Sequence, residues 1–476
     1  MLGLLALPAA LLLLISLSRI VYPFDAGNYE ALVWDSAQLS ASGQNPYAHA
    51  LHPPFVVAPY GYLYYLLVGL GLKLCGLQLW AGRLLSFAGL LICIWSVSRI
   101  VRVITGSGSA AAVAAAVVVT AWPVAVWASL QRPDFVGLGF AFAGLALLFR
   151  TTSEKPVGWR TCLAATLLFA AGFLCKMTIL LPFLVGAVRL YQSGRKREAL
   201  GLFLGTLALI GAAMLLLNAT SGGGYFWQQF EVLGQMKASP RVALRWLRAL
   251  LVAPSTWVAL AILGFGVLSG RPVRRSEERA TAALVLGYLA AAFGLAYYTS
   301  MRGGSNVNYY LEATLALGIA AGVLLTRTPR LLERSVLLTL ALALTGSVQM
   351  ARLGRGEYFR WKSLPYYREL AQTLGEQTPA DALCVSTNPD VAAAAGRTFH
   401  FADFMFYDEL ATSDTLRDLL NEAIRSRSYS AFVWGKDDAR FPGYQRVPMR
   451  TPLPDRYYPL YLYLREDLAP PQSERR

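Results

Sequence analysis

Apolar residues occur in long runs over the first 350 positions of the chain, with short polar stretches between them. Each run is about fifteen to twenty residues long, enough for a helix to cross the hydrocarbon core of a bilayer. We therefore predict an all-α polytopic membrane protein. The pattern predicts eleven spanning helices, at residues 3–22, 81–103, 109–128, 135–150, 161–175, 177–191, 199–217, 249–268, 280–299, 312–326 and 335–350.

The basic residues orient these predicted spans. The formal net charge is +15, but Lys and Arg fall mainly in short loops between apolar runs, which favours membrane topology over nucleic-acid binding. Five such loops lie on one face of the predicted bundle, which we expect to be cytoplasmic. They contain Arg99 and Arg102; Arg150, Lys155 and Arg160; Arg195, Lys196 and Arg197; Arg271, Arg274, Arg275 and Arg279; and Arg327, Arg330 and Arg334.

Residues 60–76 form an apolar stretch that does not fit this topology, because a twelfth span would put the basic loops outside. We expect a juxtamembrane helix on the outer surface, with its tyrosines at the headgroup level. In the alternative, this stretch spans the membrane, the N-terminus lies outside and residues 23–58 are cytoplasmic. Residues 23–58 contain no Lys or Arg, which favours the exported side. We expect the first run, Leu2 to Val21, to be an uncleaved helix.

Two further features define the expected domains. Only a tight hairpin of two short helices within 161–191, turning near Lys176 and Pro182, keeps the flanking basic loops on one side. After Met350 the hydropathy falls, and helical patterns at 366–374 and 414–426 alternate with the strand-like "ALCVST", "YSAFVW" and "YYPLYLYL". We predict a transmembrane domain at 1–350, with its first external loop at 23–80, and a small C-terminal α/β soluble domain at 351–476 on the outer side.

Polar residues gather at helix ends on the predicted outer face. A charged residue there can simply cap a helix or snorkel, but the gathering indicates a site. The residues are Asp25, Asn28, Tyr29, Glu30, Asp35, His49, His52, Gln131, Arg132, Asp134, Lys176, Arg302, Asn306, Asn308, Tyr309, Tyr310 and Glu312.

Each of these residues has a structural alternative. Asp25 is either the N-cap of the following helix or a general base that accepts a proton from an acceptor hydroxyl. Asp134 follows Pro133, so it is either a helix start or a second catalytic carboxylate. Lys176 either snorkels or binds phosphate. The segment "RGGSNVNYYLE", from Arg302 to Glu312, is either a turn with interfacial tyrosines or a binding surface for sugar and phosphate.

The sequence gives no firm cofactor. Its three His residues make a metal cluster improbable, although a divalent metal held by carboxylates and His stays an open alternative. The five Cys residues are scattered singly, so we expect neither a disulfide framework nor a structural zinc.

These features resemble the GT-C superfamily of membrane glycosyltransferases, which use polyprenyl-phosphate-linked sugars. The resemblance is closest to the bacterial branch related to protein O-mannosyltransferases and the lipid A aminoarabinose transferase. The motifs that carry it are Asp25 with Tyr29, "GQNPY" at 43–47, "HPP" at 52–54, the tyrosines at 60–65, "RPD" at 132–134, and "NYYLE" at 308–312. Ala26 and Gly27 stand where many relatives carry a second acidic residue, so Glu30 or Asp134 would have to replace it.

The resemblance implies an inverting transferase in a bacterial inner membrane, with its active site outside. Asp25 would deprotonate the acceptor, and Lys176 and Arg302 would hold the departing phosphate. Asp134, together with Glu30, would orient the sugars. We also expect Asn28, Tyr29, His52, Arg132, Asn308, Tyr309 and Glu312 to bind substrate, which comprises a lipid-linked sugar donor and a lipid, glycan or protein acceptor. The alternative is a transporter or flippase, but the chain shows no internal repeat and its acidic residues sit at helix ends.

Overall fold

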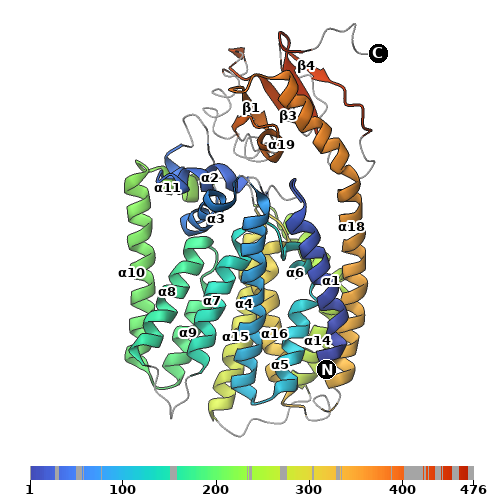
Figure 1. Ribbon diagram of the computed structural model, residues 1–476. Coiled ribbons are helices and arrows are strands. Elements are labelled where there is room, and N and C mark those ends of the chain that lie inside the picture. The colour runs from blue at the N-terminus through green and yellow to red at the C-terminus, as the bar shows by residue number, and fades with distance from the viewer. Residues whose placement is uncertain are drawn as a thin grey trace.

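The structure is a computed structural model in which a helical bundle carries a small sheet at one end (Figure 1). It describes residues 2–26, 30, 32–49, 56, 58–76, 78–150, 158–232, 234, 238–268, 276–302, 305–328, 333, 335–386, 389–400, 422, 425–426, 428–434, 441, 443–452 and 460–469.

All eleven apolar runs predicted as spans are helical. The helices are α1 (Leu2–Val21), α4 (Leu79–Thr105), α5 (Gly108–Val119), α6 (Trp122–Trp127), α7 (Pro133–Phe149), α8 (Trp159–Cys175), α9 (Leu181–Gln192), α10 (Lys196–Thr220), α13 (Pro240–Val252), α14 (Pro254–Leu268), α15 (Ser276–Thr299), α16 (Leu311–Leu325) and α18 (Ser335–Gln377). Within the described residues, five helices are long and apolar enough to cross a membrane, or six if α13 and α14 form one broken span. The number of spans stays a prediction.

Three predicted spans have different limits in the structure. The span predicted at 109–128 is divided, because α5 ends at Val119 and α6 begins at Trp122. The span predicted at 249–268 is divided, because α13 and α14 meet at an angle of 84°. Pro254 begins α14 at this break, where it has no N–H to continue the preceding helix. The span predicted to end at 350 continues instead to Gln377 in the 43-residue helix α18. The fall in hydropathy after Met350 therefore marks a change from apolar to more polar side chains within one continuous helix, and the helix does not end there.

The hairpin and the surface helix are both present. Helices α8 and α9 are joined by a turn at residues 176–180 that begins with Lys176. Helix α3 (Tyr62–Cys75) lies at the upper end of the bundle beside α2 (Leu32–Ala41) in Figure 1. Tyr64 and Tyr65 are fully buried, however, so the prediction that they contact headgroups is wrong. They pack into the core of the first external loop.

Helix α16 is the centre of the bundle. All of its residues are buried, as its uniformly apolar composition predicts. It packs against α4, α5, α14 and α15. A Cβ atom at Gly318 would lie 3.0 Å from the carbonyl oxygen of Ala114, so the glycine favours the close approach of α16 to α5.

The C-terminal residues form a five-stranded mixed sheet in the order β2-β1-β3-β5-β4. The strands are β1 (Leu383–Ser386), β2 (Thr398–His400), β3 (Ala431–Trp434), β4 (Tyr444–Val447) and β5 (Tyr461–Arg465). Strand β1 pairs in parallel with β2 and β3, whereas β5 pairs antiparallel with β3 and β4. The three predicted strands are confirmed as β1, β3 and β5. The helix predicted at 414–426 lies almost wholly outside the described residues.

Short elements complete the end of the bundle that faces the sheet. They are η1 (Pro46–His49), α11 (Gly224–Phe226), η2 (Trp227–Val232) and η3 (Val307–Tyr310), and the sheet domain adds α19 (Pro389–Ala394). One apolar cluster joins the first external loop to this domain, since it contains both Phe24 and Val391. Phe24 packs against Tyr367 of α18 with ring centroids 5.5 Å apart.

Candidate functional site

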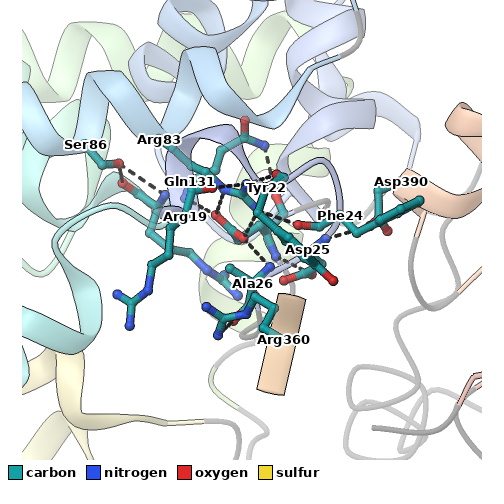
Figure 2. Close-up of polar contacts among 12 residues, drawn as sticks. Arg19, Tyr22, Phe24, Asp25, Ala26, Arg83, Ser86, Gln131, Arg360 and Asp390 are labelled. Carbon is teal, nitrogen blue, oxygen red and sulfur yellow. Dashed lines mark hydrogen bonds and ion pairs between the residues drawn. The ribbon is translucent and has the colours of Figure 1, made fainter. Parts of the chain in front are cut away.

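Arg83 of α4 holds the end of α1 and the loop that follows it. Its Nη1 donates to the carbonyl oxygens of Arg19 and Tyr22, both at 2.5 Å, and its Nη2 donates to that of Phe24 at 2.7 Å. Its Nε and Nη2 also bind the two carboxylate oxygens of Glu30 at 2.9 and 2.7 Å (Figure 2). We call residues 22–26 and 30 the Asp25 loop. One guanidinium therefore fixes the path of this loop.

Glu30 is part of this scaffold. Its carboxylate also accepts hydrogen bonds from the main-chain nitrogens of Ala26 at 2.7 Å and Gln131 at 2.6 Å. Burial raises the pKa of Glu30, but the charge and hydrogen bonds of Arg83 outweigh it and hold the pKa below its usual value. The side chain is fully buried. The prediction that Glu30 contacts substrate is therefore replaced by a structural role, because its four hydrogen bonds are all internal.

Asp25 lies at the centre of the loop. Its Oδ2 accepts a hydrogen bond from the main-chain nitrogen of Glu30 at 2.9 Å, and its own main-chain nitrogen donates to Oδ2 of Asp390 at 2.6 Å. The residue is 6% exposed. Helix α2 is described from Leu32, and residues 27–29 and 31 lie outside the described part of the chain. The capping alternative for Asp25 therefore stays open.

A second cationic cluster closes the loop from α18. Arg360 donates to the carbonyl oxygen of Ala26 at 2.6 Å and pairs with Glu357. Glu357 also accepts a hydrogen bond at 2.8 Å from Nε of Arg19, which binds two carbonyl oxygens of α6. Ala26 is thus fixed through both its nitrogen and its oxygen, and the chain around Asp25 is held from α4 and α18 together.

Asp134 lies in a separate cluster of polar side chains. Lys176 pairs with its Oδ1, and Asn308 donates to the same oxygen at 2.9 Å. Its Oδ2 accepts a hydrogen bond at 3.0 Å from Nε1 of Trp127. Asp134 is at the first turn of α7, as predicted, but its carboxylate faces these three donors. Nζ of Lys176 also lies 4.8 Å from the ring centroid of Tyr309.

Close helix packing places this cluster. A Cβ atom at Gly89 of α4 would lie 2.4 Å from the carbonyl oxygen of Phe135, so the start of α7 reaches α4 only because residue 89 is glycine. The turn after α8 brings Lys176, and η3 brings Asn308 and Tyr309.

These residues line a pocket with about 370 Å³ of empty space, part of it open to the surroundings. We call it the Lys176 pocket. Glu312 lines it and accepts a hydrogen bond at 3.0 Å from the hydroxyl of Tyr288. The buried Oδ1 of Asn308 has no hydrogen-bond partner among the described residues. The pocket therefore combines the cation of Lys176, the carboxylates of Asp134 and Glu312, and the amide of Asn308. Its lining is Asp134, Leu138, Lys176, Thr178, Ile179, Ala292, Leu295, Ala296, Thr299, Asn308, Tyr309 and Glu312.

Arg132 connects the Asp25 loop with the Lys176 pocket. Its guanidinium donates to the hydroxyl of Tyr60 and lies within electrostatic range of both Asp25 and Asp134. Arg302 has a half-buried side chain that acts electrostatically on Tyr309, but it does not line the pocket. The predicted site residues thus fall into two neighbouring groups.

Three predicted binding residues, Asn28, Tyr29 and His52, lie outside the described residues. Among those described, no three His, Cys, Asp or Glu side chains form a group that could hold a metal ion. The five Cys residues are free thiols. A metal requirement stays untested.

The sequence patterns missed Arg83, Arg360 and Asp390, which fix the Asp25 loop. Arg83 lies inside a predicted span, and a buried arginine in an apolar helix was the one available signal. Arg360 and Asp390 contact Ala26 and Asp25 across more than 300 residues of sequence. Such contacts have no local pattern.

Known proteins share this fold. A sequence profile of the family described as dolichyl-phosphate-mannose-protein mannosyltransferase matches residues 58–219. The structure of ArnT from Cupriavidus metallidurans bound to undecaprenyl phosphate has a TM-score of 0.70 and 16% identity over 99% of both chains. Its apo form gives 0.69 and 15% over the same shares. The oligosaccharyltransferase AglB from Archaeoglobus fulgidus, in complex with an inhibitory peptide and a dolichol-phosphate, gives 0.50 and 11% over 90% of this chain and 69% of that chain.

No curated protein matches the sequence. At these identities the structural matches establish the fold, and the profile match adds a family likeness in residues 58–219. The predicted resemblance to GT-C glycosyltransferases is confirmed.

Proposed function

We propose that this protein is an inverting glycosyltransferase that moves a sugar from a polyprenyl-phosphate donor to a hydroxyl group of an acceptor outside the cytoplasm. The observation that carries the proposal is the position of Asp25. Asp25 is a buried carboxylate whose neighbours in the chain are held by Arg83 and Arg360, and Arg132 interacts electrostatically both with Asp25 and with Asp134, which lines the Lys176 pocket. Group transfer from a phosphate needs a base and a cation in this arrangement.

In the proposed reaction the carboxylate of Asp25 takes the proton of the acceptor hydroxyl. The oxygen then forms a bond to the anomeric carbon, and the bond from that carbon to the phosphate oxygen breaks, so the electron pair leaves with the phosphate. The phosphate is already a good leaving group, which removes the need for a strong general acid. Attack from the face opposite the phosphate inverts the configuration.

The residues of the Lys176 pocket bind the donor in this proposal. Lys176 and Arg302 stabilise the charge that develops on the phosphate, and Arg132 lies between the phosphate and the base. Asp134 orients Lys176, which makes it a positioning residue. Asn308, Tyr309 and Glu312 bind the sugar, together with Asn28, Tyr29 and His52 from the first loop.

The comparisons support this choice of donor. The matching family is described by an activity on dolichyl-phosphate mannose, and undecaprenyl phosphate is bound to the structure that shares the fold over 99% of the chain. We place the protein in a bacterial inner membrane with the Asp25 loop and the sheet on the extracytoplasmic side. Residues 23–58, which contain no Lys or Arg, support that orientation.

The proposal is tested by incubating membranes that contain the protein with polyprenyl-phosphate sugars labelled in the sugar. Transfer of label to an acceptor lipid, glycan or protein, absent from membranes without the protein, is the expected result. Movement of the intact labelled donor across the membrane without transfer would instead support the transporter alternative.

A further inference from the structure

Asp390 brings a second carboxylate to Asp25. It belongs to the first turn of α19 in the sheet domain, 365 residues along the chain from Asp25. Its Oδ2 accepts the hydrogen bond from the main-chain nitrogen of Asp25 at 2.6 Å. Figure 2 shows the two residues facing each other, with Asp390 on the side opposite Arg83.

The surroundings of Asp390 differ from those of an ordinary surface carboxylate. The residue is 2% exposed, and its second oxygen, Oδ1, has no hydrogen-bond partner in the described part of the chain. A buried carboxylate oxygen without a donor is costly, and such groups cluster where function requires them. Val391 and Ala392 beside it join the apolar cluster, so Asp390 brings a carboxylate into an otherwise apolar contact between the sheet domain and the first external loop.

Charges reach Asp390 from two directions. Burial and the charge of Asp25 together raise its pKa from 3.8 to about 7, although the hydrogen bond from the Asp25 nitrogen and the charge of Arg83 lower it in part. Electrostatic coupling between two groups is mutual, so an ionised Asp390 strengthens the basicity of Asp25. The apolar cluster and Arg360 of α18 hold the sheet domain against the loop, so this arrangement is a fixed part of the fold.

We propose that Asp390 is a positioning residue of the active site, which fixes the main chain of Asp25 and, when ionised, makes the Asp25 carboxylate a stronger base. The proposal rests on the proposed transfer reaction. It gives the C-terminal domain a part in the chemistry, because this domain supplies a group that controls the base on the first external loop.

The test compares Asp390→Asn with the wild-type enzyme. Asparagine keeps an oxygen that can accept the hydrogen bond from the Asp25 nitrogen, but it removes the charge. Asp381→Asn is the matched control, since Asp381 is an exposed carboxylate of the same domain. For all three full-length proteins, kcat/KM for transfer from a labelled polyprenyl-phosphate sugar is measured as a function of pH.

At about pH 5.5, where Asp390 is protonated, the wild type and Asp390→Asn should have similar kcat/KM values. At about pH 8.5, where Asp390 is ionised, kcat/KM of the wild type should be roughly three- to tenfold higher than that of Asp390→Asn. Asp381→Asn should follow the wild type throughout. A ratio between wild type and Asp390→Asn that stays constant with pH would overturn the proposal, since a purely structural role does not follow the ionisation of Asp390.

Two further variants separate this inference from the proposed function. If wild type transfers sugar, Asp25→Asn does not, and the ratio for Asp390→Asn is flat, then the inference about Asp390 alone fails. If wild type does not transfer sugar with any polyprenyl-phosphate donor, the proposed function fails and this inference with it. Asp390→Ala should lower kcat at every pH, because it also removes the hydrogen bond to Asp25.

Discussion

Two carboxylate–cation pairs lie at the same end of the bundle, and they differ in what surrounds them. The side chains of Glu30 and Arg83 are both 0% exposed, and their hydrogen bonds all go to the protein itself. The side chains of Asp134 and Lys176 are 2% and 11% exposed and line a pocket. The first pair is complete within the protein, whereas the second borders space for a ligand.

Whether an ion pair lines a pocket indicates a structural or a functional role more clearly than the types of its residues do. A fully buried ion pair recovers its desolvation cost only when other hydrogen bonds complete it, as the carbonyl oxygens of Tyr22 and Phe24 do for Arg83. A pair that lines a pocket can exchange part of its interactions for a charged ligand. We therefore expect changes at Arg83 to affect folding and changes at Lys176 to affect transfer.

The largest effect is expected for Arg83→Ala. This change leaves Glu30 buried without its charged partner and removes the Arg83 hydrogen bonds to the carbonyl oxygens of Arg19, Tyr22 and Phe24. The free energy of unfolding should therefore fall by about 3–5 kcal/mol. Thermal unfolding in detergent measures it. Arg102→Ala, at an exposed position of the same helix, is the control and should change stability by less than about 0.5 kcal/mol. Equal melting temperatures for Arg83→Ala and wild type would refute the structural role.

The next prediction concerns the double variant Asp134→Asn with Lys176→Met. Removing both charges together avoids an unpaired buried ion, so stability should stay within about 1 kcal/mol of the wild type. Transfer should fall by about 100-fold, because the cation expected to stabilise the departing phosphate is lost. Steady-state kinetics and a melting curve on the same preparation check it. A wild-type transfer rate in this double variant would contradict a role for the Lys176 pocket in the reaction. The control is Lys196→Ala, at the other end of the bundle, which should change neither the transfer rate nor the melting temperature.

A smaller loss is expected for Asn308→Ala. Asn308 hydrogen-bonds Asp134 and presents a buried oxygen without a partner among the described residues. Losing one hydrogen bond to a charged group and one contact to the sugar should lower kcat/KM about tenfold. An effect on melting temperature with no effect on kcat/KM would move Asn308 into the structural group with Glu30.

The smallest expected effect is on pH-dependent stability, where Glu30 and Asp390 have opposite signs. The pKa of Glu30 is lowered by folding, so its stabilisation is complete above its unfolded value of 4.5 and is lost as the pH falls further. The pKa of Asp390 is raised from 3.8 to about 7, so its contribution is greatest below 3.8 and is lost as the pH rises to about 7. As the pH rises from 3.8 to about 7, the melting temperature of the wild type should therefore fall relative to that of Asp390→Asn. Melting temperatures of the two proteins that change in parallel with pH would contradict the raised pKa of Asp390.

Much of the fold was predictable because it is encoded locally. The apolar runs predicted most helices of the bundle, but they missed most of α13 and joined α5 and α6 into one span. The strand patterns predicted β1, β3 and β5. The C-terminal end of α18 was missed, because a fall in hydropathy shows where the side chains of a helix become polar and does not show where its backbone hydrogen bonds end. The bend between α13 and α14 at Pro254 has a local cause that the long apolar run concealed.

The candidate site was predictable as a collection of residues but not as a set of pairs. The predicted topology placed Asp134, Lys176, Asn308 and Tyr309 at helix ends on the same face of the bundle. In the structure these four residues form one cluster. Glu30 was assigned to substrate because its partner, Arg83, lies 53 residues away in an apolar helix. Asp390 could not be found at all, since its contact with Asp25 depends on how the sheet domain packs on the loop.

The central claim is that Asp25 is the general base, and the most direct measurement is the transfer rate of Asp25→Asn. Asparagine keeps the size of the side chain and an oxygen to accept the hydrogen bond from Glu30, but it cannot take a proton at neutral pH. The variant is predicted to keep the wild-type melting temperature within a few degrees and to transfer at about one hundredth of the wild-type rate or less. Transfer at the wild-type rate by a folded Asp25→Asn protein would contradict it.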